Sequence, residues 1–427
     1  MQNSVSHRLL FCRERKGTLT AGVQGEYHRF IKMPGSTGLR RKREMLCIRN
    51  GMIHNAIVEE PFEADLLIDG GKIAKIGQIG PLEAETEVID AQGLSVYPGF
   101  VEAHCHIGLD GYGAGPEVLD YNERNDILCP HLRGIDGIKA MDAAFDQAVA
   151  GGVTCVCTGP GSANVLGGTF AAIKTVGRRV DDMVVKADVA MKCAFGENPK
   201  RVYLNKCDSS RMTTAALLRE SLFKAREYLA KKERAGDDLS KMPPFDMKME
   251  ALIPVIEGKM PLKAHAHATD DIFTALRIAR EFGVKVTLEH VTEGHLIVEE
   301  LAKENVPLAV GPTLTNASKT ELRNKSWTTP GVLAKAGCQV SIITDAAVIP
   351  QQYLPQCAGF AVKAGMDPFA ALQAITINPA KHIGIEDRVG SLEVGKDADI
   401  VIADGDPLEI STTLRYVLVD GKVVKKN

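Results

Sequence analysis

The spacing of hydrophobic and polar positions changes twice along the chain. From residue 45 to residue 97, short apolar runs alternate with turn residues, which predicts β-strands. The pairs Asn50-Gly51 and Gly70-Gly71 in this stretch are typical of hairpin turns. The same strand pattern returns at 397–403 and 416–424. Neither β segment is large enough to bury a core alone, so we expect the two to pair into one β-sandwich.

The central part of the chain has a different pattern, in which apolar strands alternate with helical stretches. The strand at 153–158 follows a helical stretch at 140–150, and a long helix at 213–234 precedes further strand–helix units. Strands that alternate with helices of this length imply parallel βαβ units, and about eight of them suggest a closed (β/α)8 barrel of the α/β class. The predicted organisation is an extension at 1–44, a first sandwich part at 45–97, a TIM barrel at 98–382 and a second sandwich part at 383–427.

The first 44 residues differ from the rest in composition. They carry a basic run, Arg40-Arg-Lys-Arg43, and little hydrophobic periodicity. They contain no apolar segment typical of a signal peptide. A transit peptide, a vector-derived segment and an upstream start codon each fit the pattern. We expect this extension to lie outside the fold and to be disordered in part.

Composition narrows the class of protein and of partner. The hydrophobic content of 45% and charged content of 25% are those of a globular protein, and the net charge of −3 gives no reason to expect nucleic acid or an anionic membrane as partner. No apolar run approaches the roughly 20 residues of a membrane span. The ten cysteines form no Cys-x-x-Cys pair, which favours reduced thiols. We expect a cytoplasmic protein that acts on a small molecule.

The stretch 101–106, Val-Glu-Ala-His-Cys-His, is the first candidate for chemistry. Alternate side chains of a strand point the same way, so His104 and His106 share one face while Cys105 points to the other. Two imidazoles at the end of one strand are a natural start for a metal site. Two core histidines, each satisfied by neighbours, are the alternative for this motif alone.

Polar residues also follow apolar runs at four later positions: Lys192, His265, His290 and Asp345. In a barrel, the carboxyl ends of the strands meet at one face, where active sites lie. Coincidence across five strand ends is the weaker explanation, so we expect these side chains to converge.

These motifs resemble those of the amidohydrolase superfamily of metal-dependent hydrolases. The resemblance extends from residue 45 to 424 and is carried by Pro98-Gly-Phe-Val-Glu-Ala-His-Cys-His106, Thr376-Ile-Asn-Pro-Ala380 and a Gly-rich signature at 390–402. Segments 160–168 and 196–203 are similar to an imidazolonepropionase-like, prolidase-like subgroup. The resemblance implies a small-molecule substrate and a homo-oligomer.

The resemblance also implies the metal ligands. His104 and His106 would hold one ion together with Asp345, while His265 and His290 would hold a second. Zn2+ is the expected metal, with two ions per site and other divalent metals as alternatives.

Lys192 matches the lysine that relatives carboxylate to bridge two metals. An unmodified lysine is a cation and cannot be a ligand, so this role requires a CO2-derived carbamate. A lysine paired with a neighbouring carboxylate is the alternative. Glu197 is the alternative bridging or outer carboxylate.

The expected chemistry is hydrolysis of a C–N amide bond in a linear or peptide-like small substrate. Zinc lowers the pKa of bound water to about 7, and two metals about 3.5–4 Å apart share the resulting hydroxide. Asp345 would take its proton and pass it to the leaving nitrogen.

Two positions depart from the pattern of the superfamily. Aminohydrolases and imidazolonepropionase place a Glu three residues after the histidine that corresponds to His265, where this chain has Ala268. This argues against deamination and against a strict imidazolonepropionase. Ala346 replaces a histidine that often follows the metal-binding aspartate, which leaves substrate range and activity level open.

Substrate-binding residues are weakly specified by the sequence. His131, Arg201 and Tyr203 are candidates, although each is more readily explained as structural or solvated. His267 is a further candidate, with an outer or substrate-facing residue and a simple loop residue as equal alternatives. Two alternatives to the main interpretation remain. One is a mononuclear cyclic-amide hydrolase, similar to imidazolonepropionase, or a deaminase. The other is a non-catalytic scaffold, against which the presence of every expected ligand argues.

Overall fold

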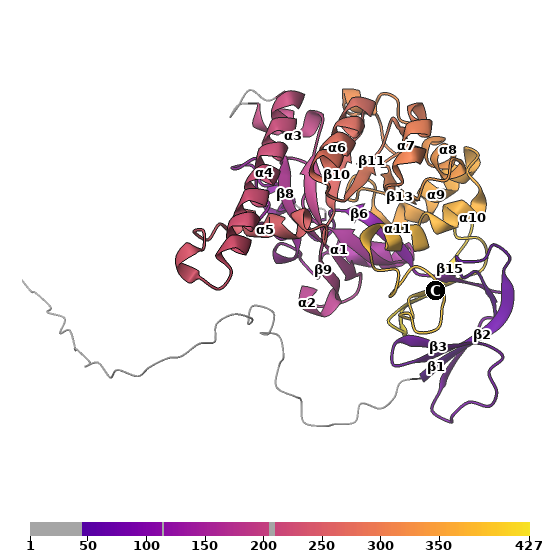
Figure 1. Cartoon of the computed structure of the whole chain (residues 1–427). Helices are drawn as coiled ribbons and strands as arrows, with labels where there is room; N and C mark the ends of the chain where they lie inside the picture. The colour runs from indigo at the N-terminus through magenta and orange to yellow at the C-terminus, as the bar shows by residue number, and fades with distance from the viewer. Residues whose placement is uncertain (1–44, 113–114, 205–209) are drawn as a thin grey trace, which may run out of the picture. The chain divides into compact units, whose positions relative to one another are not determined.

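The computed structural model describes residues 45–112, 115–204 and 210–427 (Figure 1). The extension expected at 1–44 lies outside the described residues. The described chain contains two eight-stranded sheets, and the strands of the first are neighbours in sequence order. They are β6 (Phe100–Cys105), β7 (Val153–Thr158), β8 (Leu166–Lys174), β9 (Val184–Ala194), β10 (Leu262–Ala266), β11 (Val286–His290), β12 (Leu308–Val310) and β13 (Val340–Ile342).

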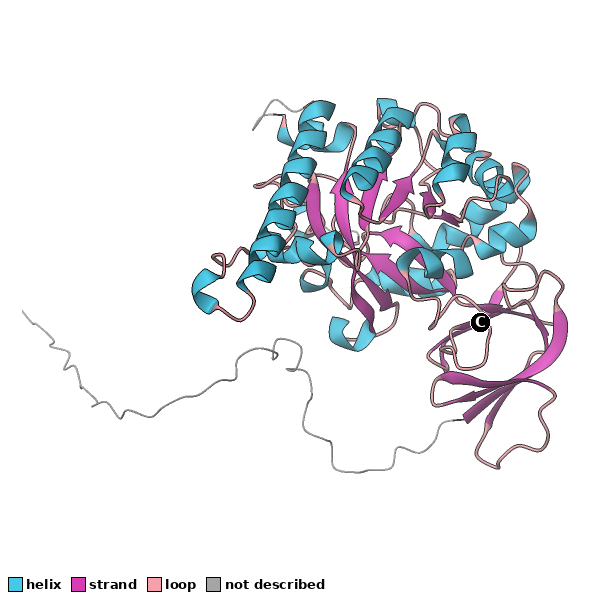
Figure 2. Ribbon diagram, viewed as in Figure 1, coloured by secondary structure: helices cyan, strands magenta, loops and turns pink. Residues whose placement is uncertain are grey.

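Helices lie around the outside of this sheet (Figure 2). Helix α6 illustrates the reason: it buries one face through Ile272, Ala275 and Ala279 and ends at Gly283, which adopts φ 66°. The α-helices are α1 (Ala143–Ala150), α2 (Val180–Met183), α3 (Glu197–Tyr203), α4 (Arg211–Ala235), α5 (Met247–Ile256), α6 (Thr269–Phe282), α7 (Val298–Glu304), α8 (Thr329–Lys335), α9 (Leu354–Lys363), α10 (Pro368–Gln373) and α11 (Ile377–Ile383).

Strand β8 departs from the expected parallel pattern. It pairs antiparallel with both β7 and β9, so the expectation of eight parallel βαβ units is wrong at this strand. Only residues 159–165 connect β7 to β8. A parallel crossover requires a dozen or more residues, which this Gly-containing connection cannot supply. The other neighbouring pairs of the sheet are parallel.

The sheet from β6 to β13 is nearly closed. Its first and last strands, β6 and β13, both form backbone hydrogen bonds with the segment at residues 374 and 375. Ile342 of β13 donates to the carbonyl of Ala374 (2.8 Å), and Val101 of β6 donates to the carbonyl of Ile375 (2.8 Å). At the carboxyl ends of the strands, His106 N donates to Ala346 O (2.6 Å). The carboxyl ends of β6 and β13 therefore lie side by side, as a barrel arrangement requires.

The second sheet combines strands from both ends of the described chain. Its order is β16-β15-β14-β5-β1-β2-β3, with β4 also paired to β1, and antiparallel pairing of β5 with β14 joins the two segments. The expected pairing of the two β segments is confirmed; their separation as a sandwich domain at 45–97 and 383–427 stays a prediction. The strands are β1 (Met45–Ile53), β2 (Phe62–Asp69), β3 (Lys72–Gly77), β4 (Glu87–Asp90), β5 (Ser95–Pro98), β14 (Ile400–Ala403), β15 (Leu414–Val419) and β16 (Lys422–Lys426).

The two expected hairpin turns have different outcomes. Gly70 and Gly71 join the antiparallel strands β2 and β3, as predicted. Asn50 and Gly51 instead lie inside β1, where the register with β2 shifts, so a hairpin there is wrong. The Asn50 N–H donates to Asp65 Oδ1 (3.0 Å), which holds the strand in a bulge rather than a reversal.

The structure also describes the cysteines and the lengths of the helices. All eight cysteines in the described parts of the chain are free thiols, and seven of them are buried. Among the helices that the structure describes, none is both long enough and apolar enough to cross a bilayer.

Candidate metal centre

The first group of candidate ligands comes from β6 and from the residue that follows β13. His104 and His106 point to the same side, as the strand period predicted. The distance from Asp345 Oδ1 to His106 Nε2 is 3.2 Å, and to His104 Nε2 it is 3.7 Å. One potential ligand atom of each residue lies within 4.8 Å of the others. The structure therefore brings together the three residues expected at the first metal.

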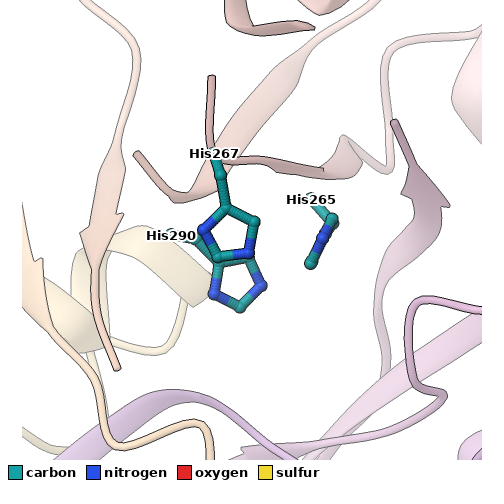
Figure 3. Close-up of side chains that lie close together, drawn as sticks. All are labelled: His265, His267 and His290. Carbon is teal, nitrogen blue, oxygen red and sulfur yellow. The ribbon is translucent and has the colours of Figure 1, made fainter. Parts of the chain in front are cut away.

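The second group consists of His265, His267 and His290 (Figure 3). The ring of His290 lies 4.3 Å from that of His265 and 4.6 Å from that of His267, centroid to centroid. His265 and His290 were expected here. His267, expected as a substrate-facing or outer residue, instead lies with them because it follows β10 and turns back toward the carboxyl end of β11.

In all five histidines of the two ligand groups, Nδ1 contacts an oxygen atom and Nε2 points toward the other residues of its group. A carbonyl oxygen only accepts, so His106 and His290 carry their proton on Nδ1 and present a lone pair at Nε2. The Nδ1 partners are Glu289 Oε2 for His104 (3.3 Å), Gly159 O for His106 (2.8 Å), Ser162 Oγ for His265 (2.8 Å), Thr292 Oγ1 for His267 (2.7 Å) and Gly311 O for His290 (2.9 Å).

Burial keeps the imidazoles of His104, His265, His267 and His290 neutral. It lowers the pKa of His104, His265 and His267 well below the usual value, and the pKa of His290 to about 4. Neutral imidazole is the form that binds metals. His290 Nε2 is buried, and no hydrogen-bond partner for it exists among the described residues. Such an orphaned atom is costly unless something binds it, and this donor set fits a divalent cation such as Zn2+.

Asp345 lies at the centre of the first group in a strained backbone conformation. Its φ is 52°, a region that L-residues rarely adopt and that is often found at functional sites. Burial raises the pKa of Asp345, but the surrounding imidazoles of His290, His106 and His104 outweigh burial and hold this pKa below its usual range. Asp345 is therefore a carboxylate at neutral pH, the form that can both bind a cation and accept a proton.

Lys192 on β9 lies next to the first group and is fully buried. Its Nζ is 3.3 Å from His104 Nε2 and lies over the ring of Phe170. Burial lowers the pKa of Lys192 to about 8, opposed by the charges of Asp345 and Glu289. A lysine with such a pKa is partly neutral near physiological pH. Glu197, the alternative bridging carboxylate, instead directs Oε1 to the backbone N–H of Glu321 (3.0 Å).

A buried ionic network beneath His104 escaped prediction from the sequence. Glu289 Oε2 lies 3.0 Å from Lys263 Nζ, and Glu289 Oε1 lies 2.9 Å from His382 Nε2. Thr287 Oγ1 also donates to Glu289 Oε1 (2.7 Å). Lys263 and Glu289 are charged residues within apolar strands rather than at strand ends. Their position inside those strands is the sequence feature that could have identified them.

Glu102 is a second buried carboxylate that the sequence did not single out. Its Oε2 accepts from the backbone N–H and the hydroxyl of Thr344 (2.9 and 2.7 Å) and from Gln351 Nε2 (3.0 Å). Burial raises the pKa of Glu102 to about 7. Because Thr344 immediately precedes Asp345, Glu102 holds β6 and the Asp345 segment together.

A cavity of about 400 Å3 opens onto both groups of ligands. His106, Asp345, His265 and His267 are among its lining residues, together with Arg201 from α3. The candidate His131 lines a different cavity of about 820 Å3. Tyr203 is buried, with Oη donating to Asp126 O (2.8 Å) and accepting from Asn164 Nδ2 (2.9 Å), and it is not among the lining residues of either cavity. Of the substrate candidates, the structure places His267 and Arg201 at the site.

Ala268 and Ala346, which depart from the pattern of the superfamily, both lie near the candidate ligands. Ala268 is the residue that precedes α6, and its methyl group cannot transfer protons. A carboxylate nevertheless reaches this region from elsewhere: Glu321 Oε1 lies 3.8 Å from His265 Nε2. Ala346 is buried and borders a small cavity of about 40 Å3.

Comparisons with known proteins agree with this arrangement. A crystal structure of an amidohydrolase from Thermotoga maritima superposes with a TM-score of 0.86 at 39% identity, covering 90% of this chain and 100% of that one. An imidazolonepropionase from Symbiobacterium thermophilum is 28% identical over 79% of this chain and 84% of its own length. The amidohydrolase tasK from Hapsidospora irregularis is 28% identical over 84% of this chain, which spans only 39% of that protein.

The family assignment rests on a match to a family model over more than half of the chain. The sequence model of the amidohydrolase family matches residues 95–425, which include every candidate ligand described above. An adenine deaminase from Desulforamulus reducens is also similar, at 23% identity over 89% of this chain and 57% of its own length. The chain therefore belongs to the amidohydrolase family and is a hydrolase of carbon–nitrogen bonds.

Proposed function

We propose that this protein hydrolyses a linear amide or peptide-like bond in a small substrate, with two divalent metals and with Asp345 as the proton carrier. The observation that supports the proposal is the convergence of two ligand groups, His104/His106/Asp345 and His265/His267/His290, on one cavity. The cavity of about 400 Å3 suits a small molecule rather than a folded protein.

In this proposal the histidines bind the metals, and Asp345 also transfers protons. When bound, Zn2+ supplies Lewis acidity that polarises a carbonyl oxygen and acidifies water. Asp345 Oδ1, held on the same side as His106 Nε2, takes a proton from the attacking water and returns it to the leaving nitrogen. The water oxygen thus bonds to the carbonyl carbon as the C–N bond breaks and the nitrogen leaves protonated.

Lys192 is proposed to carry a CO2-derived carbamate. The buried, partly neutral amine has the electron pair that attacks CO2, and the anionic product would replace an amine beside His104 Nε2 with carboxylate oxygens, which are ligands for Zn2+.

Arg201 is proposed to bind a carboxylate of the substrate. It is an exposed residue of α3 that lines the cavity, and guanidinium matches carboxylates through paired hydrogen bonds. The variant Arg201→Met is expected to raise KM at least about tenfold for substrates with a free carboxylate, and to leave KM for neutral amides unchanged. An equal rise for both classes would remove Arg201 from substrate recognition.

A mononuclear cyclic-amide hydrolase is the second candidate, favoured by the similarity to imidazolonepropionase over most of both chains. Ala268 argues against it, because the carboxylate expected three residues after His265 is missing at that position.

The experiment that separates the candidates is a substrate screen with the full chain loaded with Zn2+. N-acyl amino acids and dipeptides form one set, and an imidazolone, dihydroorotate and adenine form the other. Turnover of the first set, abolished in Asp345→Asn, is the expected result. Turnover confined to the cyclic substrates or adenine would overturn the proposal.

A further inference from the structure

Glu321 directs a buried carboxylate oxygen at the second group of histidines. It lies in the short 3-10 helix Thr320–Leu322 between β12 and β13, and only 4% of the residue is exposed. Its Oε1 is 3.8 Å from His265 Nε2 and 3.7 Å from His267 Nε2. No described residue meets hydrogen-bond geometry with this oxygen, and its ion-pair partner is Lys319 Nζ at 2.5 Å. A buried carboxylate needs a cation nearby, and either this ammonium or a metal ion can fill that role.

The surrounding backbone fixes the direction in which this oxygen points. Glu321 Oε2 accepts from the N–H of Glu197 (3.0 Å), and Glu197 Oε1 accepts in return from the N–H of Glu321 (3.0 Å). A side chain at Gly196 would collide with Glu321 Oε2, so glycine is required there, where φ is also positive at 78°. With Oε2 held in this way, Oε1 faces the histidines.

The distances from Glu321 Oε1 to two of the three histidines approach those of a metal coordination shell. Bond lengths of about 2.0–2.2 Å and tetrahedral angles place neighbouring donor atoms about 3.4 Å apart. The contacts from Glu321 are a few tenths of an ångström longer, and the three histidines each have a potential ligand atom within 4.8 Å of the others.

We propose that Glu321 is the fourth donor of a metal site formed by His265, His267 and His290, which holds its ion without any contribution from Lys192. This inference rests on the proposed function only in taking a divalent metal as the occupant. The inference goes beyond the proposed function because the second ion no longer depends on the Lys192 carbamate, so the two sites bind their ions separately.

Lys319 supplies an opposing effect within the same cluster. Its Nζ lies 2.5 Å from Glu321 Oε1 and 3.1 Å from Asn198 Oδ1, so its ammonium balances the carboxylate charge. A divalent ion at the site has to displace this ammonium from Oε1 or tolerate its charge nearby. Removal of Lys319 therefore strengthens metal binding, whereas removal of the Glu321 charge weakens it.

The test is Zn2+ titration by calorimetry of the chelator-stripped full chain, in a Lys192→Met background that excludes a carbamate. In that background, adding Glu321→Gln is expected to weaken one zinc-binding event at least about tenfold, and adding Lys319→Met to strengthen the same event. Glu293→Gln is the matched control, because Glu293 is a nearby buried carboxylate that binds Asn324 and the N–H of Thr269 instead. It should leave zinc affinity unchanged.

Two results would overturn the inference. One is an unchanged zinc affinity in Glu321→Gln, with thermal unfolding showing that the variant is folded. The other is a Lys192→Met chain that binds no zinc at all. Neither depends on turnover: zinc bound through Glu321 in a chain that cleaves no amide would remove the proposed function and leave this inference in place.

Discussion

Glu289 Oε2 lies 3.3 Å from His104 Nδ1 at the centre of the barrel, where both residues are fully buried. The carboxylate thereby orients the ring that presents Nε2 toward Asp345 and Lys192. Contacts of this kind fix the tautomer of a metal-binding histidine and raise its basicity. Glu289→Gln is therefore expected to weaken zinc binding at the His104 site about 10–100-fold, as measured by competition with a chelating dye.

The same substitution has a separate effect on stability. Without the Glu289 charge, Lys263 remains buried and loses its ion pair, at a cost of about 3–5 kcal/mol in the free energy of unfolding. The double variant Glu289→Gln/Lys263→Met is expected to recover much of this stability and none of the zinc affinity. Recovery of both properties together would show that Glu289 acts on the metal only through general stability.

Lys192 provides a prediction for pH dependence. Burial lowers its pKa to about 8. The neutral amine attacks CO2, and its fraction rises as the pH increases through this value. At equal dissolved CO2, carbamate formation by the metal-free chain, in which the nitrogen bonds to carbon and releases one proton to solvent, is therefore expected to be faster at about pH 9 than at about pH 6. Native mass spectrometry should detect an added mass of one CO2, absent in Lys192→Met. An adduct of equal size in that variant would place the modification elsewhere.

Asp345→Asn is expected to lower kcat at least about 100-fold, because the amide cannot accept the proton of the attacking water. Since His104 and His106 remain, the protein should still bind zinc, with reduced affinity at that site. The measurements are kcat on the best amide substrate and zinc content. Full activity in a zinc-loaded Asp345→Asn chain would exclude Asp345 as the proton carrier.

A stability prediction concerns the contact between the two sheets. Lys174, at the end of β8, is buried and forms ion pairs with Asp397 (3.1 Å), Asp399 (2.8 Å) and Asp420 (3.0 Å). Lys174→Met leaves the buried carboxylate of Asp399 without its cation, whereas Asp397 keeps Lys72 and Arg388, and the substitution is expected to cost about 3–5 kcal/mol in urea denaturation. Zinc affinity of the folded variant should not change. A loss below about 1 kcal/mol would show that the cluster behaves like an exposed ion pair.

The parts of the fold and of the site that depend on strand periodicity were predictable from the sequence. The two-residue period placed His104 and His106 on one face, and the ends of apolar runs located His265, His290 and Asp345. The structure brings these five residues into two groups, and His106, His265 and Asp345 line one cavity. The antiparallel direction of β8 was not predictable in this way, because a parallel and an antiparallel buried strand have the same apolar pattern.

The residues that escaped prediction share a physical reason. Glu321 lies in a connection between strands rather than at a strand end, so only the tertiary fold brings it to His267. Glu289 and Lys263 lie within strands, and their pairing depends on the neighbouring register of β10 and β11. Charged residues inside apolar strands are a usable signal, since burial of such residues requires partners.

The most direct test of the account is the number of zinc ions per chain, together with amide turnover, for the full chain purified without chelators. Elemental analysis by plasma mass spectrometry gives the first quantity, and the substrate screen gives the second. The account predicts two zinc ions per chain and hydrolysis of N-acyl amino acids or dipeptides that depends on them. A chain that binds no zinc, even after reconstitution, would contradict the central claim.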